Sequence, residues 1–207
     1  MRVLELFSGT GSVGNVCRRL GCEVTSLDRD LPADLQMDIL DWNYKSLPRR
    51  SFDFTWASPP CTEYSVAKTV GVRKLEEANA VVQRTLEIIA YFDPPYWTME
   101  NPQTGLLKKQ PFMTNLPYDD VDYCKYGMPY RKRTRLWNNI GEWIPKPLCK
   151  KDCGHMVGNR HEQSAQQVPH KHLASVRQRF RPEDLYKVPE ALLEELLEPL
   201  LPPALPA

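Results

Sequence analysis

The sequence predicts an α/β protein with a doubly wound, mostly parallel, seven-stranded sheet, a Rossmann-like arrangement, followed by a small Cys/His-rich basic extension. Three observations predict it. The apolar segment Arg2–Phe7 runs directly into a glycine-rich turn and a helical pattern. Strand-like and helix-like segments then alternate along the chain, and 207 residues with 42% apolar content suffice for one well-packed domain. In such sheets, ligands bind beyond the carboxyl ends of the strands.

The first strand is followed by Ser8-Gly9-Thr10-Gly11-Ser12-Val13-Gly14, which contains the pattern G-x-G-x-x-G. Val13, Val16 and Leu20 then recur at helical spacing. Glycines in this context let the backbone turn tightly and approach a ligand closely, and the helix N-terminus offers free N–H groups. The segment therefore predicts a binding site for a nucleotide-like ligand.

Later segments continue the alternation. We expect strands at Cys22–Leu27, Leu35–Leu40, Ser51–Trp56, Tyr96–Met99, around Val121–Tyr123 and at Thr134–Ile140, an amphipathic helix from Arg73 to about Phe92, and a C-terminal helix over Val188–Leu201.

Two acids follow or lie within the early strands. Asp28 ends the second strand, where an acid can accept both ribose hydroxyls of an adenosine; the alternative is a solvated turn residue. Asp38, placed inside the third strand, either accepts from an adenine amino group or caps a turn.

The fourth strand ends in Ala57-Ser58-Pro59-Pro60-Cys61. Two prolines remove backbone donors and fix φ, so the chain leaves the sheet stiffly and delivers Cys61 to the ligand-binding edge. A cysteine there is either a nucleophile or a small buried apolar residue.

Charge is distributed unevenly although the net charge is only +1. Residues 1–120 hold 13 basic and 16 acidic residues, residues 121–181 hold 13 and 4 together with all four histidines, and residues 182–207 hold 1 and 6. The basic window indicates an anionic partner such as nucleic acid. Six cysteines are too sparse for a disulfide scaffold, and we expect no signal peptide and no membrane span, hence an intracellular protein in a bacterial cytoplasm or a nucleus.

Four stretches, in order, resemble the motifs of C5-cytosine DNA methyltransferases: Leu4–Gly11, Ser58–Cys61, Met99–Pro102 and Tyr126–Arg135. The resemblance covers about residues 1–140, and the compact form looks like small phage or viral members, which serve restriction-modification or viral DNA modification. It implies a catalytic domain at 1–140, a short DNA-contacting segment at 141–181, and a C-terminal helix and tail at 182–207.

The resemblance also implies a chemistry. A Cys61 thiolate adds to C6 of a cytosine turned out of the duplex, and C5 then takes a methyl group from S-adenosylmethionine. Glu100 protonates N3, Arg135 binds O2, and Arg133 pairs with the carboxylate or a phosphate. The field of the arginines lowers the pKa of the thiol.

Further roles follow from the same resemblance. The residues expected around the methyl donor are Phe7, Ser8, Gly9, Thr10, Gly11, Asp28, Arg29, Asp38, Ile39 and Pro60, and those expected to contact DNA are Thr62, Tyr64, Ser65, Asn101, Arg131 and Lys132.

The chain departs from the family pattern at several positions. Thr62 stands where glutamine usually follows the cysteine, Arg131 stands in the glutamine slot of the arginine motif, and only Tyr186–Pro189 lies near the place of the closing asparagine-serine motif. No stretch after residue 140 is long enough for a target-recognition domain. We therefore expect a recognition site of about two to four base pairs, or a partner chain that supplies the readout. The oligomeric state stays open.

Cys149, Cys153, His155 and His161 lie within thirteen residues and could hold one Zn²⁺; the alternative is ordinary loop cysteines and DNA-facing histidines. Asp93-Pro94-Pro95-Tyr96 matches a signature of amino-methyltransferases, but its place between helix and strand favours a rigid loop. The remaining alternatives for function are methylation of RNA such as tRNA and a non-catalytic DNA-binding relic of the fold.

Overall fold

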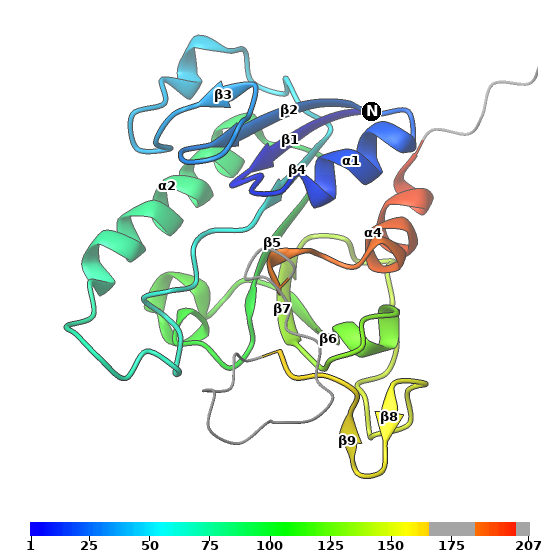
Figure 1. Cartoon of the computed structure of the whole chain (residues 1–207). Coiled ribbons are helices and arrows are strands. Elements are labelled where there is room, and N and C mark those ends of the chain that lie inside the picture. The colour runs from blue at the N-terminus through cyan, green and yellow to red at the C-terminus, as the bar shows by residue number, and fades with distance from the viewer. Residues whose placement is uncertain (166–184, 202–207) are drawn as a thin grey trace, which may run out of the picture.

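One seven-stranded sheet forms the centre of the computed structural model, which describes residues 1–165 and 185–201 (Figure 1). Its order is β3-β2-β1-β4-β5-β7-β6; the strands β1 to β5 are parallel, and β7 is antiparallel to both β5 and β6. The strands are β1 (Arg2–Leu6), β2 (Glu23–Asp28), β3 (Leu35–Gln36), β4 (Phe54–Ala57), β5 (Tyr96–Pro102), β6 (Tyr118–Asp122) and β7 (Arg133–Asn138). The predicted fold class is confirmed.

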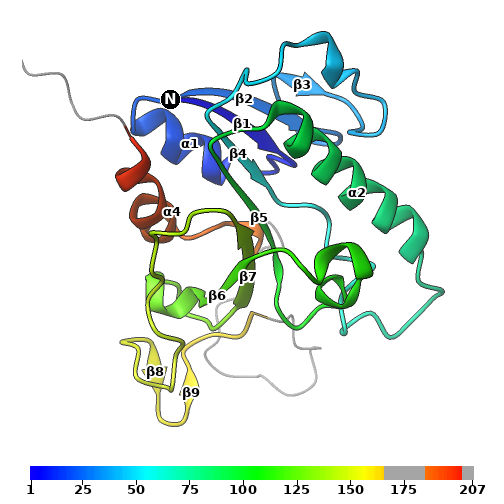
Figure 2. The same cartoon turned by 180° about the vertical axis from the view of Figure 1, so that it is seen from behind.

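Helices cover both faces of the sheet (Figures 1 and 2). On one face, α1 (Ser12–Arg19) and α4 (Glu190–Leu197) lie side by side, and Val16 and Leu192 are buried there with Leu136 of β7. On the other face, α2 (Leu75–Phe92) buries Val82 and Ile88 in a second apolar cluster. Apolar burial of this kind, at about 25 cal/mol per Å², supplies most of the folding free energy.

The C-terminal helix is part of this packing. Leu192, Leu193, Leu196 and Leu197 are all buried. Arg19 of α1 also forms ion pairs with α4, but exposed pairs of this kind contribute little. The helix begins at Glu190 rather than Val188, because the preceding proline occupies the N-cap position with extended backbone.

Several short elements differ from the predicted ones. The third strand ends at Gln36, so Asp38 lies in the following turn, where its Oδ1 accepts a hydrogen bond from the Leu40 amide at 2.9 Å. Asp93-Pro94-Pro95 connects α2 to β5 as expected for a rigid loop, with Asp93 in the left-handed region at φ 48°. The remaining elements are the 3₁₀ turns η1 (Tyr44–Ser46), η2 (Leu107–Lys109), η3 (Pro111–Met113), η4 (Tyr123–Tyr126) and η6 (Glu198–Leu200), and the hairpin of β8 (Met156–Val157) and β9 (Arg160–His161).

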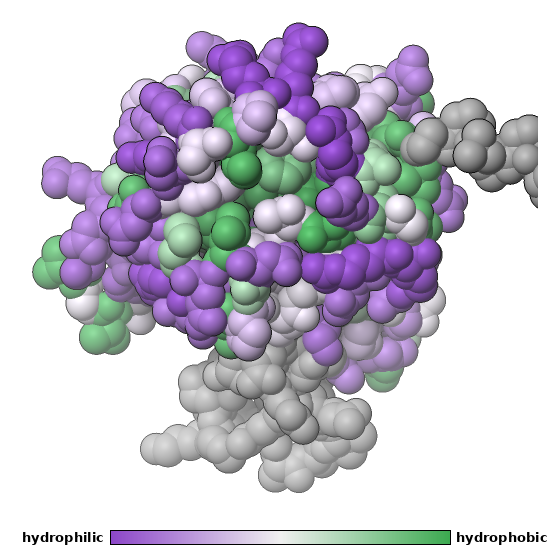
Figure 3. Space-filling view, turned by 90° about the horizontal axis from the view of Figure 1, so that it is seen from above, coloured by the Kyte–Doolittle hydropathy of each residue, from purple (hydrophilic) through white to green (hydrophobic). Residues whose placement is uncertain are grey.

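The surface carries both apolar and hydrophilic side chains. On the face seen in Figure 3, apolar side chains gather in a central area that hydrophilic ones surround. Within the described ranges, the structure holds no helix with the length and apolar character needed to cross a membrane. Residues 166–181 of the predicted DNA-contacting segment lie outside the described residues.

Candidate active site

A cavity of about 400 Å³ lies at the carboxyl ends of β1, β2, β4 and β5, a size that suits a small-molecule ligand. The structure brings together there nearly all residues predicted for the methyl donor, together with Cys61 and Glu100. Its lining includes Phe7, Ser8, Gly9, Thr10, Asp28, Arg29, Asp38, Ile39, Pro60, Cys61, Thr62, Glu100, Asn101 and Lys132. Gly11 lines an adjoining hollow that shares Ser8, Gly9 and Thr10 with this cavity.

The glycine turn is shaped for close approach to a ligand. Gly9 and Gly11 have φ of 54° and 71°, where a side chain is strained. Phe7 has φ of 60° despite its bulk, an outlier of the kind that gathers at binding sites. A Cβ at Gly14 would overlap the Glu5 carboxylate, so this glycine lets α1 pack closely on β1.

Asp28 and Asp38, the two acids predicted to contact the ribose and the adenine, hold the turns that form one wall of the cavity. Asp28 accepts from the amides of Gly9 at 2.8 Å and of Asp30 and Leu31 at 2.9 Å. Asp38 caps its turn and lies 3.6 Å from a guanidinium nitrogen of Arg29. Both acids therefore serve the turns. Oδ2 of Asp28 and the two carboxylate oxygens of Asp38 each keep a lone pair for a ligand, whereas Oδ1 of Asp28 already accepts from two amides.

On the part of the wall formed by β1 and the glycine turn, two buried polar atoms lack a hydrogen-bond partner within the described ranges. Glu5 Oε2 and Ser8 Oγ have no hydrogen-bond partner among the described residues. Burial raises the pKa of Glu5 to about 7, against weaker lowering by neighbouring backbone amides and Arg18. Buried polar atoms are normally paired, so these two indicate a ligand with donors. The ammonium and ribose hydroxyls of S-adenosylmethionine provide such donors, and the residues present therefore fit this cofactor.

The segment that carries Cys61 is held from both sides. The Ser58 amide donates to the Leu6 carbonyl at 3.2 Å, and Asn101 Nδ2 donates to the Pro59 carbonyl at 2.8 Å. Asn101 is only 1% exposed, so its predicted contact with DNA is not met; in this structure it positions the Pro-Pro-Cys segment. Asn101 of β5 thus supports the segment that leads from the end of β4 to Cys61.

Cys61 itself is half-buried at the cavity. Burial raises the pKa of its thiol, the negative charge of Glu100 raises it further, and Lys132 opposes both. The cation that acts on the thiol is therefore a lysine rather than the predicted arginines.

Glu100 has two polar partners, Tyr123 and Lys132, that the sequence analysis did not predict for it. The Tyr123 hydroxyl donates to Glu100 Oε1 at 3.2 Å, and Lys132 Nζ lies 3.6 Å from the same oxygen. Tyr123 is fully buried, which raises the pKa of its hydroxyl well above the usual range and keeps it a donor. Lys132 also donates to the Leu185 carbonyl at 3.2 Å.

The register between β5 and β7 corrects the role predicted for the arginine motif. Asn101 pairs with Arg135, and Glu100 pairs with Leu136. Paired residues share a face and neighbours alternate, so Arg133 and Arg135 lie on the sheet face opposite to Glu100. Both are occupied there: Arg135 binds Asp120 at 2.7 and 2.9 Å and stacks over Tyr118, and Arg133 binds Asp122 at 3.0 and 2.7 Å.

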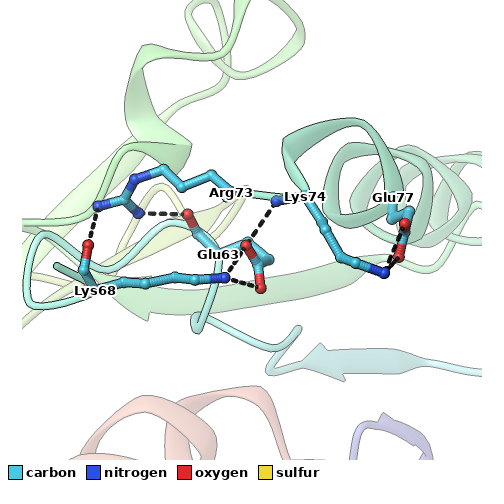
Figure 4. A network of polar contacts seen from close by, with 5 residues as sticks. All are labelled: Glu63, Lys68, Arg73, Lys74 and Glu77. Atoms are coloured by element: carbon cyan, nitrogen blue, oxygen red, sulfur yellow. Dashed lines mark hydrogen bonds and ion pairs between the residues drawn. The ribbon is translucent and has the colours of Figure 1, made fainter. Parts of the chain in front are cut away.

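The loop after Cys61 is braced by a polar network, drawn in Figure 4. Glu63 accepts from Lys68 Nζ at 2.6 Å and from the Lys74 amide at 2.8 Å, while Arg73 donates to the carbonyls of Glu63 and Lys68.

Of the DNA contacts predicted on this loop, only Thr62 lines the cavity. Tyr64 is buried and its hydroxyl donates to Asn79 at 2.8 Å, so the prediction for this side chain is not met. Ser65 Oγ accepts from the Ala67 amide at 3.2 Å, and Arg131 is exposed outside the cavity lining.

Residues near the C-terminus complete the wall. Tyr186 and Val188 line the cavity, and the Val188 amide donates to Ser12 Oγ at 3.3 Å. They belong to the stretch that lies near the place of the family's closing motif. In the sequence, only the position of Tyr186 and Val188 just before the C-terminal helix indicated that they could line the cavity.

The predicted metal ligands meet only in part. Cys149, Cys153 and His161 converge with Cys124, and the four ligand atoms lie within 4.8 Å of one another. His155 does not join them; its Nδ1 lies 3.6 Å from a carboxylate oxygen of Glu162. The predicted set is therefore wrong at one position, because Cys124 is distant in sequence and reaches the cluster through the fold.

The fold and this site define a protein of the methyltransferase fold with a cysteine at the cavity beside the glycine turn. No family model matches the chain. The chain is 39% identical over 175 residues to the "Probable DNA (cytosine-5)-methyltransferase" of Frog virus 3 (isolate Goorha), covering 77% of this chain and 80% of that protein. The chain belongs to the DNA (cytosine-5)-methyltransferase family.

A solved structure with the same fold is that of a candidate DNA modification methyltransferase encoded within an Escherichia coli prophage. It matches with a TM-score of 0.54 and 18% identity, over 72% of this chain and 52% of that one. The chain thus spans about half the length of this structural relative.

Proposed function

We propose that the chain transfers a methyl group from S-adenosylmethionine to C5 of a cytosine in DNA, through a covalent bond between Cys61 and C6. The observation that supports this most is that Cys61, Glu100 and Lys132 line the same cavity as the glycine turn. A thiol nucleophile, a carboxyl group and a cation on one wall match what methylation at a poorly nucleophilic carbon requires.

In this proposal the Cys61 thiolate forms an S–C6 bond, the C5=C6 electron pair moves toward C5, and N3 takes a proton from Glu100. S-adenosylmethionine, when bound, supplies an electrophilic methyl group that C5 can take. The C5 proton then leaves to water, the S–C6 bond breaks to return the thiolate, and N3 returns its proton to Glu100. Lys132 favours the thiolate and holds Glu100 in place, with Tyr123 donating to the same carboxylate.

The cofactor would be held by the glycine turn, by Asp28 and Asp38, and by the orphaned acceptors Glu5 and Ser8. Residues 1–140 would carry out catalysis, with Tyr186 and Val188 completing the cofactor wall. An enzyme acting on cellular or viral DNA would work inside a cell.

The DNA contacts would come mainly from exposed basic residues of the segment 141–181 and of the arginine motif: Arg131, Lys150, Lys151 and Arg160 are exposed. Contacts of this kind bind phosphates and weaken steeply with salt, but identify few bases. We therefore expect a recognition site of about two to four base pairs, or a partner chain that supplies readout. Genome-wide mapping of methylated cytosines decides this, since a motif of five or more base pairs without a partner contradicts it.

The decisive test is covalent trapping. An oligonucleotide with 5-fluorocytosine, which lacks a removable C5 proton, should give a stable protein–DNA adduct in the presence of S-adenosylmethionine. Cys61→Ser should give none, while the matched variant Cys22→Ala, at a cysteine remote from the cavity lining, should retain it. An adduct with tRNA alone would replace DNA by RNA as substrate. No adduct with either would mean that the chain lacks this activity.

A further inference from the structure

Among the described residues, a Cys/His cluster that includes Cys124 of η4 forms a second candidate site, outside the cavity of the proposed reaction. Cys124 comes from η4, Cys149 and Cys153 from the loop between β7 and β8, and His161 from β9. Segments 25 to 37 residues apart in sequence thus place three thiols and one imidazole together.

The geometry suits a tetrahedral cation. The four ligand atoms lie within 4.8 Å of one another, and Cys149 Sγ lies 3.5 Å from His161 Nε2. A zinc tetrahedron with Zn–S bonds of about 2.3 Å and Zn–N bonds of about 2.0 Å has ligand atoms about 3.5 to 3.8 Å apart. Small side-chain shifts would bring the set to that spacing, and three cysteines with one histidine form a closed structural zinc set.

The backbone around the cluster supports a charged sulfur. The Lys151 amide donates to Cys149 Sγ at 3.3 Å, and Lys151 has φ of 68°, a conformation rare for lysine that turns the chain back toward the sulfur. Hydrogen bonds to ligating atoms are the usual outer support of metal sites. His155, the sequence-adjacent alternative, faces Glu162 instead.

The segment that carries the cluster has almost no core of its own. Between residues 144 and 165, Cys149 is the only side chain classed as buried, and β8 and β9 are two residues long each. So short a hairpin is not stable in water by itself. A bound metal would supply the missing folding free energy, as it does in small metal-stabilised modules.

The cluster also adjoins the candidate active site through the chain. Cys124 follows Tyr123, whose hydroxyl donates to Glu100. The Cys149 amide donates to Asp122 Oδ2 at 2.9 Å, and Asp122 precedes Tyr123. A metal at the cluster would therefore fasten residues 145–165 to the end of β6 and to the turn that presents Tyr123.

We propose that Cys124, Cys149, Cys153 and His161 bind one structural Zn²⁺ that folds residues 145–165 onto the sheet. The proposal does not depend on the proposed methyl transfer, because its tests are metal content and proteolysis rather than activity. A failure of methylation would leave them unaffected.

The experiment measures zinc by mass spectrometry in full-length protein purified under reducing conditions without chelator. About one zinc per chain is expected. Cys124→Ser and His161→Asn should bind zinc more than about 10-fold more weakly, since removal of outer partners alone costs 10- to 100-fold. His161→Cys should retain the metal, and His155→Asn and Cys22→Ser are the matched controls that should keep it.

Trypsin provides the second readout, because Lys150, Lys151 and Arg160 are exposed on this segment. Zinc removal should accelerate cleavage there by at least about 10-fold and leave α2 resistant, which separates local loss of order from global unfolding. Wild-type protein that holds no zinc and takes up none when it is added would overturn the proposal. Equal loss in His155→Asn and His161→Asn would overturn the ligand set.

Discussion

Cys61 and the glycine turn follow the last residues of the parallel strands β4 and β1, whereas Glu100 lies within β5 and Lys132 lies directly before β7, where β5 and β7 pair antiparallel. A residue beyond a strand end reaches the rim whichever face its neighbours take. Within a strand, a shift by one residue moves a side chain to the other face.

This difference explains why Cys61 and the predicted residues of the glycine turn line the cavity, whereas the predicted arginines do not. In the arginine motif, residue type alone points to Arg133 and Arg135. The pairing of β5 with β7 puts both on the face opposite to Glu100, and Lys132 supplies the cation instead. Antiparallel register therefore decides which cationic side chain faces Glu100 on that side of the cavity.

The largest effect is expected where the two halves meet, at Glu100. Glu100→Gln keeps the shape of the side chain but removes the proton that N3 would take, so kcat should fall by about 10²- to 10⁴-fold. Tritium transfer from labelled S-adenosylmethionine to DNA measures it. Glu87→Gln, exposed on α2, is the control. Unchanged turnover in Glu100→Gln would exclude this carboxyl group from catalysis.

Lys132 and Arg135 provide the direct test of the register. Lys132→Ala should lower kcat by about 10²- to 10³-fold, because it removes a cation beside Glu100 and Cys61. Arg135→Ala should instead lower the free energy of unfolding by about 2 kcal/mol, because it leaves Asp120 without its partner, with kcat nearly unchanged. Denaturant melts and single-turnover rates separate the two. The opposite assignment of effects would restore the arginine to the active site.

Glu5 allows a pH test in the parallel half. Its pKa is raised to about 7 in the folded protein by burial, so the unfolded chain loses this proton first and stability falls as pH rises from about 4.5 to 7. In the cofactor-free protein, Glu5→Gln should therefore gain about 3 kcal/mol relative to wild type between those pH values. Urea melts at several pH values measure this, with exposed Glu23→Gln as control. Parallel stability curves for wild type and Glu5→Gln would contradict it.

The smallest effect is a shift in the titration of Cys61. Burial and Glu100 raise the pKa of the thiol, so alkylation by iodoacetamide should reach half its maximal rate above the ordinary pH for a cysteine. Lys132→Ala should move this midpoint higher still, and Arg135→Ala should leave it in place. Peptide mass spectrometry follows Cys61 separately from the other cysteines. A lower midpoint in Lys132→Ala would mean that the lysine does not act on the thiol.

The sequence alone predicted the fold class, the succession of strands and helices along the chain, and most of the residues that line the cavity. Local patterns sufficed because β1, β4 and the glycine turn carry strong strand, proline and glycine signals whose geometry depends on neighbours in sequence. The residues predicted to surround S-adenosylmethionine are of this kind, and nearly all of them line one cavity.

Only the tertiary structure decided which cation faces Glu100, that Tyr123 donates to it, and that Cys124 rather than His155 completes the thiol cluster. It also showed that Asn101 and Tyr64 are buried supports. These outcomes depend on strand register and on segments far apart in sequence, which spacing along the chain does not encode. The physical reason is that a local pattern determines where an element lies, whereas the face and the partners of each side chain are set by what packs against that element.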